Sequence, residues 1–210
     1  MSDKAQSIEA ETGKEISFER PQLDRLNIGC GRKRLPHAVN VDISSSVDPD
    51  LVLDLNQIPW PFPAETFGEV FASDVIEHCD DVIRVMEEVH RVCRDGAIVH
   101  ITVPHFSCVN AFTDPTHQHF FSSSSFQYVT GEQEFSFYTE ARYRNRATSL
   151  VFFPTLLNKL IHRLANRWPD AYERRWAWMF PAWFIYFELE VRKRSTGEPL
   201  EGDVAAHACV

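Results

Sequence analysis

The sequence lacks the features of several protein classes. Its formal net charge is −9, so it has no overall positive field to hold a phosphate backbone, and we expect no nucleic-acid partner. The longest apolar run, residues 177–187, is interrupted by Pro181 and has about half of the roughly 20 residues that a membrane-spanning helix needs. We therefore expect no transmembrane segment.

Patterns of disulfide and structural zinc sites are also missing. The chain has an odd number of cysteines with no C-x-x-C pair, namely Cys30, Cys79, Cys93, Cys108 and Cys209. This usage is typical of reduced thiols. The polar stretch over residues 1–15 contains no apolar segment of the signal-peptide kind. Both observations predict a cytoplasmic protein.

The 210 residues, of which 44% are hydrophobic, are enough for one sizeable core. We expect a flexible N-terminal arm over residues 1–22, a single domain over 23–195 and a flexible tail over 196–210. Apolar runs predict strands at residues 25–29, 38–43, 50–55, 68–78, 97–104, 141–152 and 183–194. Helical spacing of apolar residues predicts amphipathic helices over 80–94 and 154–168. This alternation indicates an α/β fold with a largely parallel sheet.

Ligands of open parallel sheets bind at the carboxyl ends of the strands. The first predicted strand ends in "LNIGCG", where two glycines allow a sharp turn and close approach of a ligand, although such a turn alone is weak evidence. Asp42 ends the next strand and could accept both hydroxyls of a ribose. No third glycine follows, and Asp42 comes too soon after Gly31 for a full helix between them, which argues against a dinucleotide such as NAD.

Four segments together suggest a family. In order and spacing, "LNIGCGRKRLPHAVNVDI", "DLVLDLNQIPWPF", "FGEVFASDVIEH" and "VIRVMEEVHRVCRDGAIVHITVPH" resemble the successive motifs of class I S-adenosylmethionine-dependent methyltransferases. More narrowly, they resemble small bacterial methyltransferase-domain proteins linked to surface-saccharide or secondary metabolism. The resemblance covers about residues 23–130. It implies a Rossmann-like sheet, mostly parallel with an antiparallel C-terminal strand, and S-adenosylmethionine as cofactor.

The same resemblance assigns cofactor contacts by position. Gly29, Cys30 and Gly31 would line the methionine part and Asp42 would bind the ribose. Asp54 and Leu55 would flank the adenine, while Ser73 and Asp74 would close over the cofactor near its amino group. The first helix is shorter than in the family, so Arg32 or Lys33 either pairs with the cofactor's carboxylate or is an ordinary solvated surface cation.

The stretch "AFTDPTHQHFF", residues 111–121, has no helical or strand period. We favour a catalytic pocket in which His117 or His119 is the general base and Asp114 orients the imidazole, with His105 nearby and phenylalanines as a dry wall. A divalent metal bound by His105, Asp114, His117 and His119 is a less favoured alternative. A third is a loop that the histidines merely hold in place. Glu77 and His78 either point toward the same site or belong to a helix start.

Residues 156–187 mix basic side chains with tryptophans and other large apolar residues. They could form a membrane-surface contact, but we favour core packing, with the aromatics shaping the acceptor pocket or a subunit interface. A homodimer is left open.

The predicted function is O-methylation of a saccharide or other small-molecule hydroxyl. The alternatives are an N-, C- or peptide methyltransferase of natural-product biosynthesis, or a non-catalytic cofactor-binding partner protein.

Overall fold

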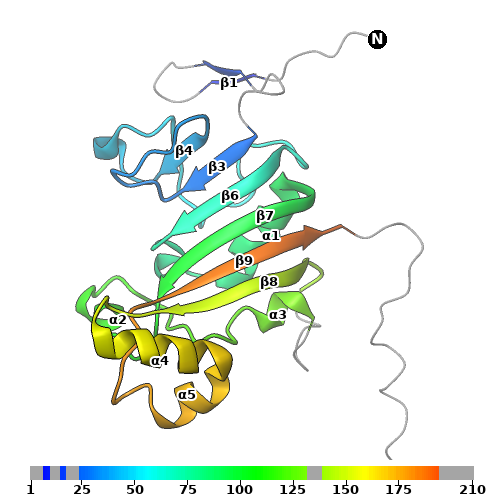
Figure 1. The fold of residues 1–210 in the computed structure, drawn as a ribbon. Coiled ribbons are helices and arrows are strands. Elements are labelled where there is room, and N and C mark those ends of the chain that lie inside the picture. The colour runs from blue at the N-terminus through cyan, green and yellow to red at the C-terminus, as the bar shows by residue number, and fades with distance from the viewer. Residues whose placement is uncertain (1–6, 10–14, 18–23, 132–138, 194–210) are drawn as a thin grey trace, which may run out of the picture.

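The computed structural model describes residues 7–9, 15–17, 24–131 and 139–193. Its centre is a seven-stranded sheet in the order β5-β4-β3-β6-β7-β9-β8 (Figure 1). In chain order the strands are β3 (Arg25–Ile28), β4 (Val39–Asp42), β5 (Leu51–Val52), β6 (Phe67–Ser73), β7 (Cys93–Pro104), β8 (Arg142–Val151) and β9 (Phe184–Arg192). Each overlaps a predicted strand, but β5 and β6 end earlier than predicted, and β7 begins at Cys93, within the predicted helix 80–94.

Among these seven strands, β9 alone runs in the opposite direction. Pairing is parallel from β5 through β7, whereas β9 is antiparallel to both of its neighbours, β7 and β8. This confirms the predicted α/β fold, a Rossmann-like sheet that is mostly parallel with an antiparallel C-terminal strand. Parallel strands end at the same edge, so the residues that follow β3, β4, β5 and β6 can form one site.

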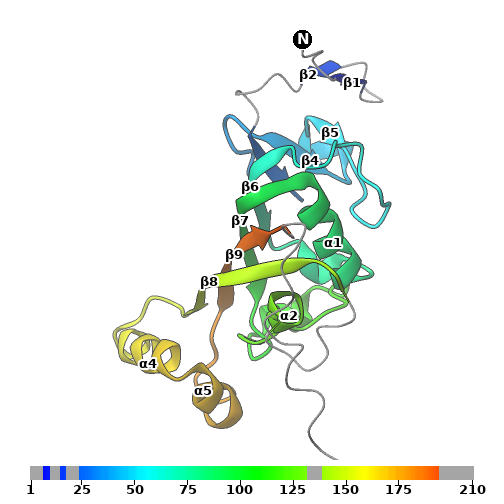
Figure 2. The same cartoon turned by 90° about the vertical axis from the view of Figure 1, so that its right-hand side faces the viewer.

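The helices of the described residues are grouped on one face of the sheet and at its lower end (Figures 1 and 2). They are α1 (Val82–Val92), α2 (Asn110–Thr113), α3 (Gln127–Thr130), α4 (Leu156–Arg167) and α5 (Pro169–Arg175), with 3-10 turns η1 (Ser45–Val47) and η2 (Ile76–His78). Asp81 caps α1 by accepting a hydrogen bond from the backbone of Arg84, as an N-cap acid does. Figure 2 shows α1 and α2 on one side, while α4 and α5 project on the other.

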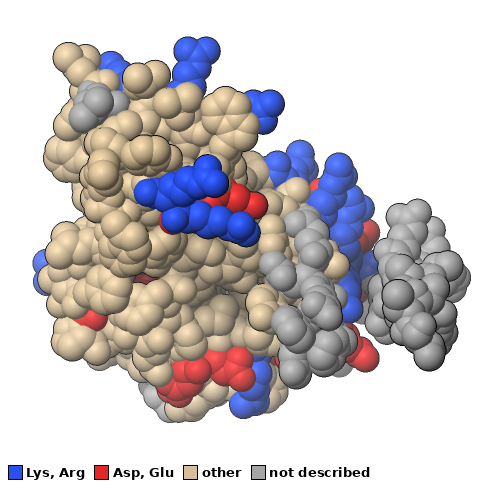
Figure 3. Space-filling model, turned by 90° about the horizontal axis from the view of Figure 1, so that it is seen from below, with Lys and Arg blue, Asp and Glu red and all other residues tan. Residues whose placement is uncertain are grey.

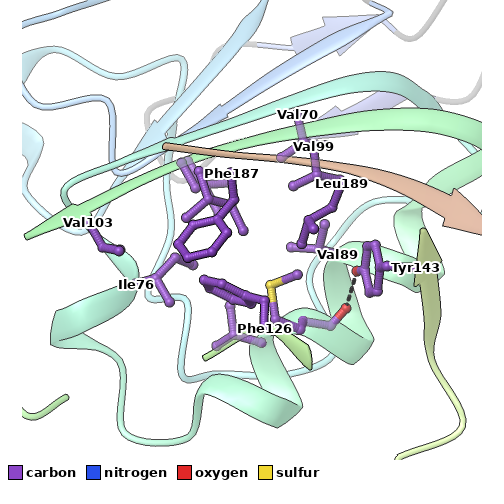
Figure 4. Packing of buried hydrophobic residues seen from close by; sticks show 14 of the residues in the cluster. Val70, Ile76, Val89, Val99, Val103, Phe126, Tyr143, Phe187 and Leu189 are labelled. Carbon is purple, nitrogen blue, oxygen red and sulfur yellow. Dashed lines mark hydrogen bonds between the residues drawn. The ribbon is translucent and has the colours of Figure 1, made fainter. Parts of the chain in front are cut away.

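The core under α1 is closed by β9 and by the segment before β8 (Figure 4). The rings of Phe126 and Phe187 meet edge to face with centroids 4.8 Å apart. The buried hydroxyl of Tyr143 donates a hydrogen bond of 2.6 Å to the carbonyl of Met86. These contacts connect the C-terminal third of the chain to the helix that covers the parallel strands.

Part of the predicted N-terminal arm has structure. Its strands β1 (Ser7–Glu9) and β2 (Glu15–Ser17) pair in antiparallel fashion. The other residues of the arm, and the predicted tail over 196–210, lie outside the described residues. The domain limits of 23 and 195 stay a prediction.

Candidate active site

The turn after β3 requires glycine at one position and borders open space at another. Gly29 has a φ of +61°, and a Cβ there would lie 2.3 Å from Cγ2 of Val75. Gly31 has a φ of +48°, but a Cβ there would meet nothing within 4 Å. Left-handed backbone is costly for residues other than glycine. The turn is therefore fixed against the segment after β6 and leaves room for a ligand beside Gly31.

Asp42, the last residue of β4, closes this turn. One carboxylate oxygen accepts a hydrogen bond of 2.8 Å from the backbone N–H of Gly31, and the other accepts one of 2.9 Å from Ser44. A carboxylate has about four lone-pair positions, so Asp42 can still accept hydrogen bonds from hydroxyl groups. The open glycine turn and this carboxylate fit the aminoacyl and ribose ends of an adenosyl cofactor.

A buried amide network, not predicted from the sequence, holds β3, β4 and their loop. Asn27 donates to the side-chain oxygen of Asn40 at 2.9 Å, and the backbone N–H of Asn40 donates to Asp50 at 2.9 Å. Burial alone would raise the pKa of Asp50, but hydrogen bonds from Asn40 and Arg34 hold that pKa below its ordinary value. The two asparagines alternate with apolar residues along β3 and β4, a pattern that indicates exposure, yet both are buried.

The other predicted cofactor residues lie at the ends of β5 and β6. Asp54 accepts a hydrogen bond from the backbone of Asn56 at 3.0 Å, and Leu55 beside it is buried. Ser73 is exposed at the end of β6. Asp74 follows with a φ of +54°, and partial desolvation raises the pKa of its carboxyl, while charges on Lys33, His117 and His78 act in the opposite direction. The Asp74 carboxyl therefore interacts electrostatically with Lys33, which lies just after the glycine turn, and with His78 and His117.

His117 faces a buried acid. Its Nδ1 lies 2.9 Å from the carbonyl oxygen of Ala111; because a carbonyl only accepts, Nδ1 carries the proton and Nε2 is left with a lone pair. That Nε2 lies 3.9 Å from Oε1 of Glu77. The ring also packs edge to face on His78, with centroids 4.6 Å apart.

Glu77 is an unusual carboxyl group. Its side chain is 1% exposed, and neither oxygen has a hydrogen-bond partner. Burial raises the pKa of Glu77 to about 7, and the nearby charges of Asp74 and Asp114 add to the increase. Its backbone carbonyl accepts hydrogen bonds from Gln118 at 2.8 Å and His119 at 3.2 Å, which anchors the histidine segment beside the end of β6.

The remaining residues of the predicted catalytic set have structural partners. Asp114 is predicted to orient an imidazole, but its carboxylate accepts from the backbone and hydroxyl of Thr116 at 2.9 and 2.7 Å, bonds that lower its pKa. His119 donates from Nε2 to the carbonyl of Cys79 at 2.9 Å. Each therefore holds the loop.

His105 belongs to a different cluster. It is fully buried, donates from Nε2 to Glu173 at 3.2 Å, and accepts at Nδ1 from the backbone of Ser107 at 3.1 Å. The predicted metal set of His105, Asp114, His117 and His119 is thus not assembled. Among the described residues, the group of histidines and acids that could hold a metal ion is Glu77, His78 and His117.

The phenylalanines of the histidine segment divide between surface and core. Phe112 and Phe120 stack with centroids 4.7 Å apart and are 58% and 50% exposed. Phe121 is buried and stacks on Phe126. Two of the three predicted wall residues therefore form an exposed aromatic pair beside the site.

The predicted core packing of the C-terminal aromatic region holds for only some of its residues. Tyr172 and Phe187 are buried, but the tryptophans and leucines of the α4–α5 end are at least half exposed, namely Leu156, Leu160, Leu164, Trp168, Trp176 and Trp178. In the part of the chain that the structure describes, no helix is long and apolar enough to cross a membrane.

Comparison with known proteins agrees with this geometry. Residues 26–101 match the family model of a methyltransferase domain. Over these residues the chain is similar to a methyltransferase domain, its sheet has the class I methyltransferase fold, and its cofactor is S-adenosylmethionine. No curated protein matches the chain. The matched residues of this methyltransferase include the glycine turn, Asp42, Glu77 and His78 and end within β7.

Solved structures share the fold of the methyltransferase at low sequence identity. An S-adenosylmethionine-dependent methyltransferase from Archaeoglobus fulgidus is 15% identical with a TM-score of 0.58, over 82% of this chain and 88% of its own. The YcgJ protein from Bacillus subtilis is 15% identical with a TM-score of 0.54, over 85% and 95%. An S-adenosylmethionine-dependent methyltransferase from Mesorhizobium loti is 13% identical with a TM-score of 0.53, over 80% and 90%. Such identities establish the common fold.

Proposed function

We propose that this methyltransferase methylates a hydroxyl oxygen of a small molecule, with saccharides as the first class to test. The observation that carries the proposal is the position of Glu77 and His117, whose Oε1 and Nε2 lie 3.9 Å apart beside the segment that contacts Gly29 through Val75. A hydroxyl acceptor must lose its proton during transfer, whereas a neutral amine has a lone pair ready. Proton-accepting groups at this place therefore favour oxygen.

The cofactor residues are proposed by position and supported by their surroundings. Gly29, Cys30 and Gly31 would hold the methionine part, Asp42 the ribose, Asp54 and Leu55 the adenine, and Ser73 and Asp74 the region near the amino group. S-adenosylmethionine supplies an electrophilic methyl group on a sulfonium. The support is the open space beside Gly31 and the remaining acceptor capacity of Asp42.

His117 would take the proton of the acceptor. Its Nε2 carries a lone pair because Nδ1 donates to Ala111. As the acceptor's oxygen bonds to the methyl carbon, the carbon–sulfur bond breaks, its electron pair stays on sulfur, and the hydroxyl proton passes to Nε2. The exposed pair Phe112 and Phe120 offers a flat apolar surface for a ring-shaped acceptor.

A panel of acceptors tests the proposal. Purified enzyme with methyl-labelled S-adenosylmethionine is offered monosaccharides, nucleotide sugars, phenols and amines, and product is detected by mass spectrometry. For the best hydroxyl acceptor, His117→Gln should lower kcat by about 100-fold or more with unchanged cofactor affinity. The matched control is His162→Gln on the exposed face of α4, which should keep full kcat. Methylation of amines but of no hydroxyl would refute the proposal.

We also propose that the α4–α5 end contacts an anionic membrane surface. Leu156, Leu160 and Leu164, spaced one turn apart on α4, are 86%, 60% and 50% exposed, and Trp178 is 71% exposed. Exposed apolar patches of this kind mark interaction sites. On the same helix Ile161 and Ala165 pack toward the core, so the exposed leucines form a second apolar face.

The charge of this end supports an anionic lipid surface as the partner. Exposed basic residues lie among the apolar ones although the whole chain is acidic, namely Lys159, Arg163, Arg167, Arg174 and Arg175. Figure 3 views the molecule from this end and shows lysine and arginine side chains beside a broad surface without charged groups. Apolar residues mixed with cations suit the headgroup region of anionic lipids, whereas a purely apolar patch would suit a second copy of the chain.

Sedimentation with vesicles tests this surface. The enzyme should pellet with vesicles that contain phosphatidylserine and remain in solution with phosphatidylcholine alone. Leu160→Glu should abolish pelleting, while Val109→Glu, at a residue that is 74% exposed elsewhere, should not. No pelleting, together with a dimer in analytical ultracentrifugation that Leu160→Glu dissociates, would refute the membrane contact and assign the face to a homodimer.

A further inference from the structure

We infer that Glu77, His78 and His117 bind a divalent transition-metal ion. One ligand atom from each side chain can be chosen so that all three lie within 4.8 Å of one another. Ligand atoms around a tetrahedral zinc ion are about 3.4 Å apart, given metal–ligand bonds of about 2.0–2.1 Å. Metal binding would therefore draw the three side chains closer together.

The buried carboxylate of Glu77 is the second, independent observation. It is 1% exposed, and neither oxygen has a hydrogen-bond partner, although buried polar groups in proteins are nearly always paired. Its Oε1 points toward Nε2 of His117 at 3.9 Å. A cation between the two would satisfy both, and it would explain why an acid is kept here without a protein donor.

The histidines are oriented as metal ligands are. His117 uses Nδ1 to donate to the carbonyl of Ala111 at 2.9 Å, and Nδ1 of His78 lies 2.9 Å from the hydroxyl oxygen of Thr116. In metalloproteins the ring nitrogen that does not bind the ion is usually held in this way, which fixes the tautomer and the ring direction. Each Nε2 then carries a lone pair that can bind a metal ion.

The ligand types select the metal. Two imidazoles and one carboxylate suit Zn²⁺, Co²⁺, Fe²⁺ or Mn²⁺, whereas Ca²⁺ and Mg²⁺ prefer sites made of oxygen. Three protein ligands leave at least one coordination position open, as in catalytic zinc sites. The segment that supplies Glu77 and His78 directly follows Asp74 and Val75, which connects the metal site to the proposed cofactor residues.

The role of the ion rests on the proposed function, because it requires a hydroxyl acceptor. The acceptor oxygen would bind the ion, which lowers the pKa of its hydroxyl. In the metal-bound enzyme Nε2 of His117 would hold the ion and so would not take the proton, and the hydroxyl proton would pass to solvent water. The ion would thereby supply a more nucleophilic acceptor oxygen for the methyl group, and the carbon–sulfur electron pair would stay on sulfur.

Titration with cobalt tests the site without any acceptor. The full chain is stripped with a chelator, dialysed, and titrated with Co²⁺ while the visible absorption of the bound ion is followed; Zn²⁺ is then added to displace it. One saturable site is expected. Glu77→Gln and His117→Gln should each weaken Co²⁺ binding by about 100-fold or more, since even changes around metal ligands cost 10–100-fold.

Two further variants act as matched controls. His119→Gln removes the neighbouring histidine, which is bound to the carbonyl of Cys79, and His162→Gln removes one on α4; both should bind Co²⁺ as the unchanged chain does. Thermal unfolding of each variant checks that it is folded. No saturable Co²⁺ binding, or binding that folded Glu77→Gln and His117→Gln retain in full, would overturn the inference.

A parallel titration separates this inference from the proposed function. The stripped protein is titrated with S-adenosylmethionine, which contacts the glycine turn and Asp42 in our proposal and none of the three metal ligands. Cofactor binding and hydroxyl methylation without Co²⁺ binding would reject the metal and keep the function. Co²⁺ binding that the ligand variants lose, with methylation of amines only, would keep the metal and reject the function.

Discussion

The carboxylate of Asp42 accepts a hydrogen bond of 2.8 Å from the backbone N–H of Gly31. This bond ties the end of β4 to the turn after β3, so one side chain both shapes the cofactor turn and offers acceptors to the ribose. Changes at Asp42 should therefore act on cofactor affinity more than on folding.

Asp42→Ala should weaken binding of S-adenosylmethionine and of its demethylated product by about 10–100-fold. Loss of hydrogen bonds to a charged group costs about 1.5–3 kcal/mol. Calorimetric titration measures both affinities. Asp170→Asn, at an exposed acid on α5, is the control and should bind both compounds normally. Equal affinities in Asp42→Ala and the unchanged chain would remove Asp42 from the cofactor site.

Gly29→Ala and Gly31→Ala should differ although both residues have positive φ. At Gly29 the new methyl group would lie 2.3 Å from Cγ2 of Val75, so we expect steric strain in addition to the backbone cost of about 1–2 kcal/mol. At Gly31 nothing lies within 4 Å, so only the backbone cost applies.

Urea unfolding compares the two glycine variants, and the double change Gly29→Ala with Val75→Ala should recover part of the loss. If both single variants lose the same free energy of unfolding, then Val75 moves away from the new methyl group without destabilising the fold.

Glu173 should contribute stability that disappears in acid. Burial would raise the pKa of its carboxyl, but hydrogen bonds with His105 and Ser123 hold it below the ordinary value of 4.5. A lowered folded-state pKa means that the contribution is fully present above about pH 4.5 and is lost as the pH falls through the lower folded value.

Glu173→Gln should therefore be less stable than the unchanged chain at pH 7, by about 1–3 kcal/mol. The difference should shrink at pH values below the folded pKa, because Glu173 is then protonated in the unchanged chain as well. Urea unfolding at several pH values measures it. A difference that stays constant with pH would show that Glu173 acts by packing alone.

Tyr143→Phe should lower the free energy of unfolding by about 1–3 kcal/mol, because it leaves the buried carbonyl of Met86 without its 2.6 Å hydrogen bond. Tyr186→Phe is the comparison: its hydroxyl lies 2.7 Å from His100 where water can replace it, so the loss should be smaller. Chemical denaturation measures both. The reverse order would contradict the role of Tyr143 in joining β8 to α1.

The strands could be predicted from the sequence because their signals are local. Apolar runs in β3, β6 and β7 and the helical spacing in α1 depend on neighbouring residues only. The antiparallel direction of β9 followed instead from the family resemblance, since an apolar run does not specify its direction. The same limit explains α4, where the spacing predicts a helix but does not reveal that its leucines face away from the core.

The active site was only partly predictable, because its pairings join distant segments. His105 is paired with Glu173, and no spacing in the sequence connects the two. Asp114 is satisfied by Thr116, a near neighbour, so its proximity to the histidines in the sequence was misleading. Glu77 lies near the end of a predicted strand, but only the fold shows that its carboxyl is buried and lacks hydrogen bonds.

The position of β9 affects how the chain can fold during synthesis. β9 lies between β7 and β8 in the sheet but follows both in the chain. A ribosome therefore releases β8 before the strand that connects it to the sheet, and β7 has a bare edge in the meantime. The last two strands can join the sheet only after residue 192 has left the exit tunnel, so the nascent chain must keep that edge from pairing with another chain until then.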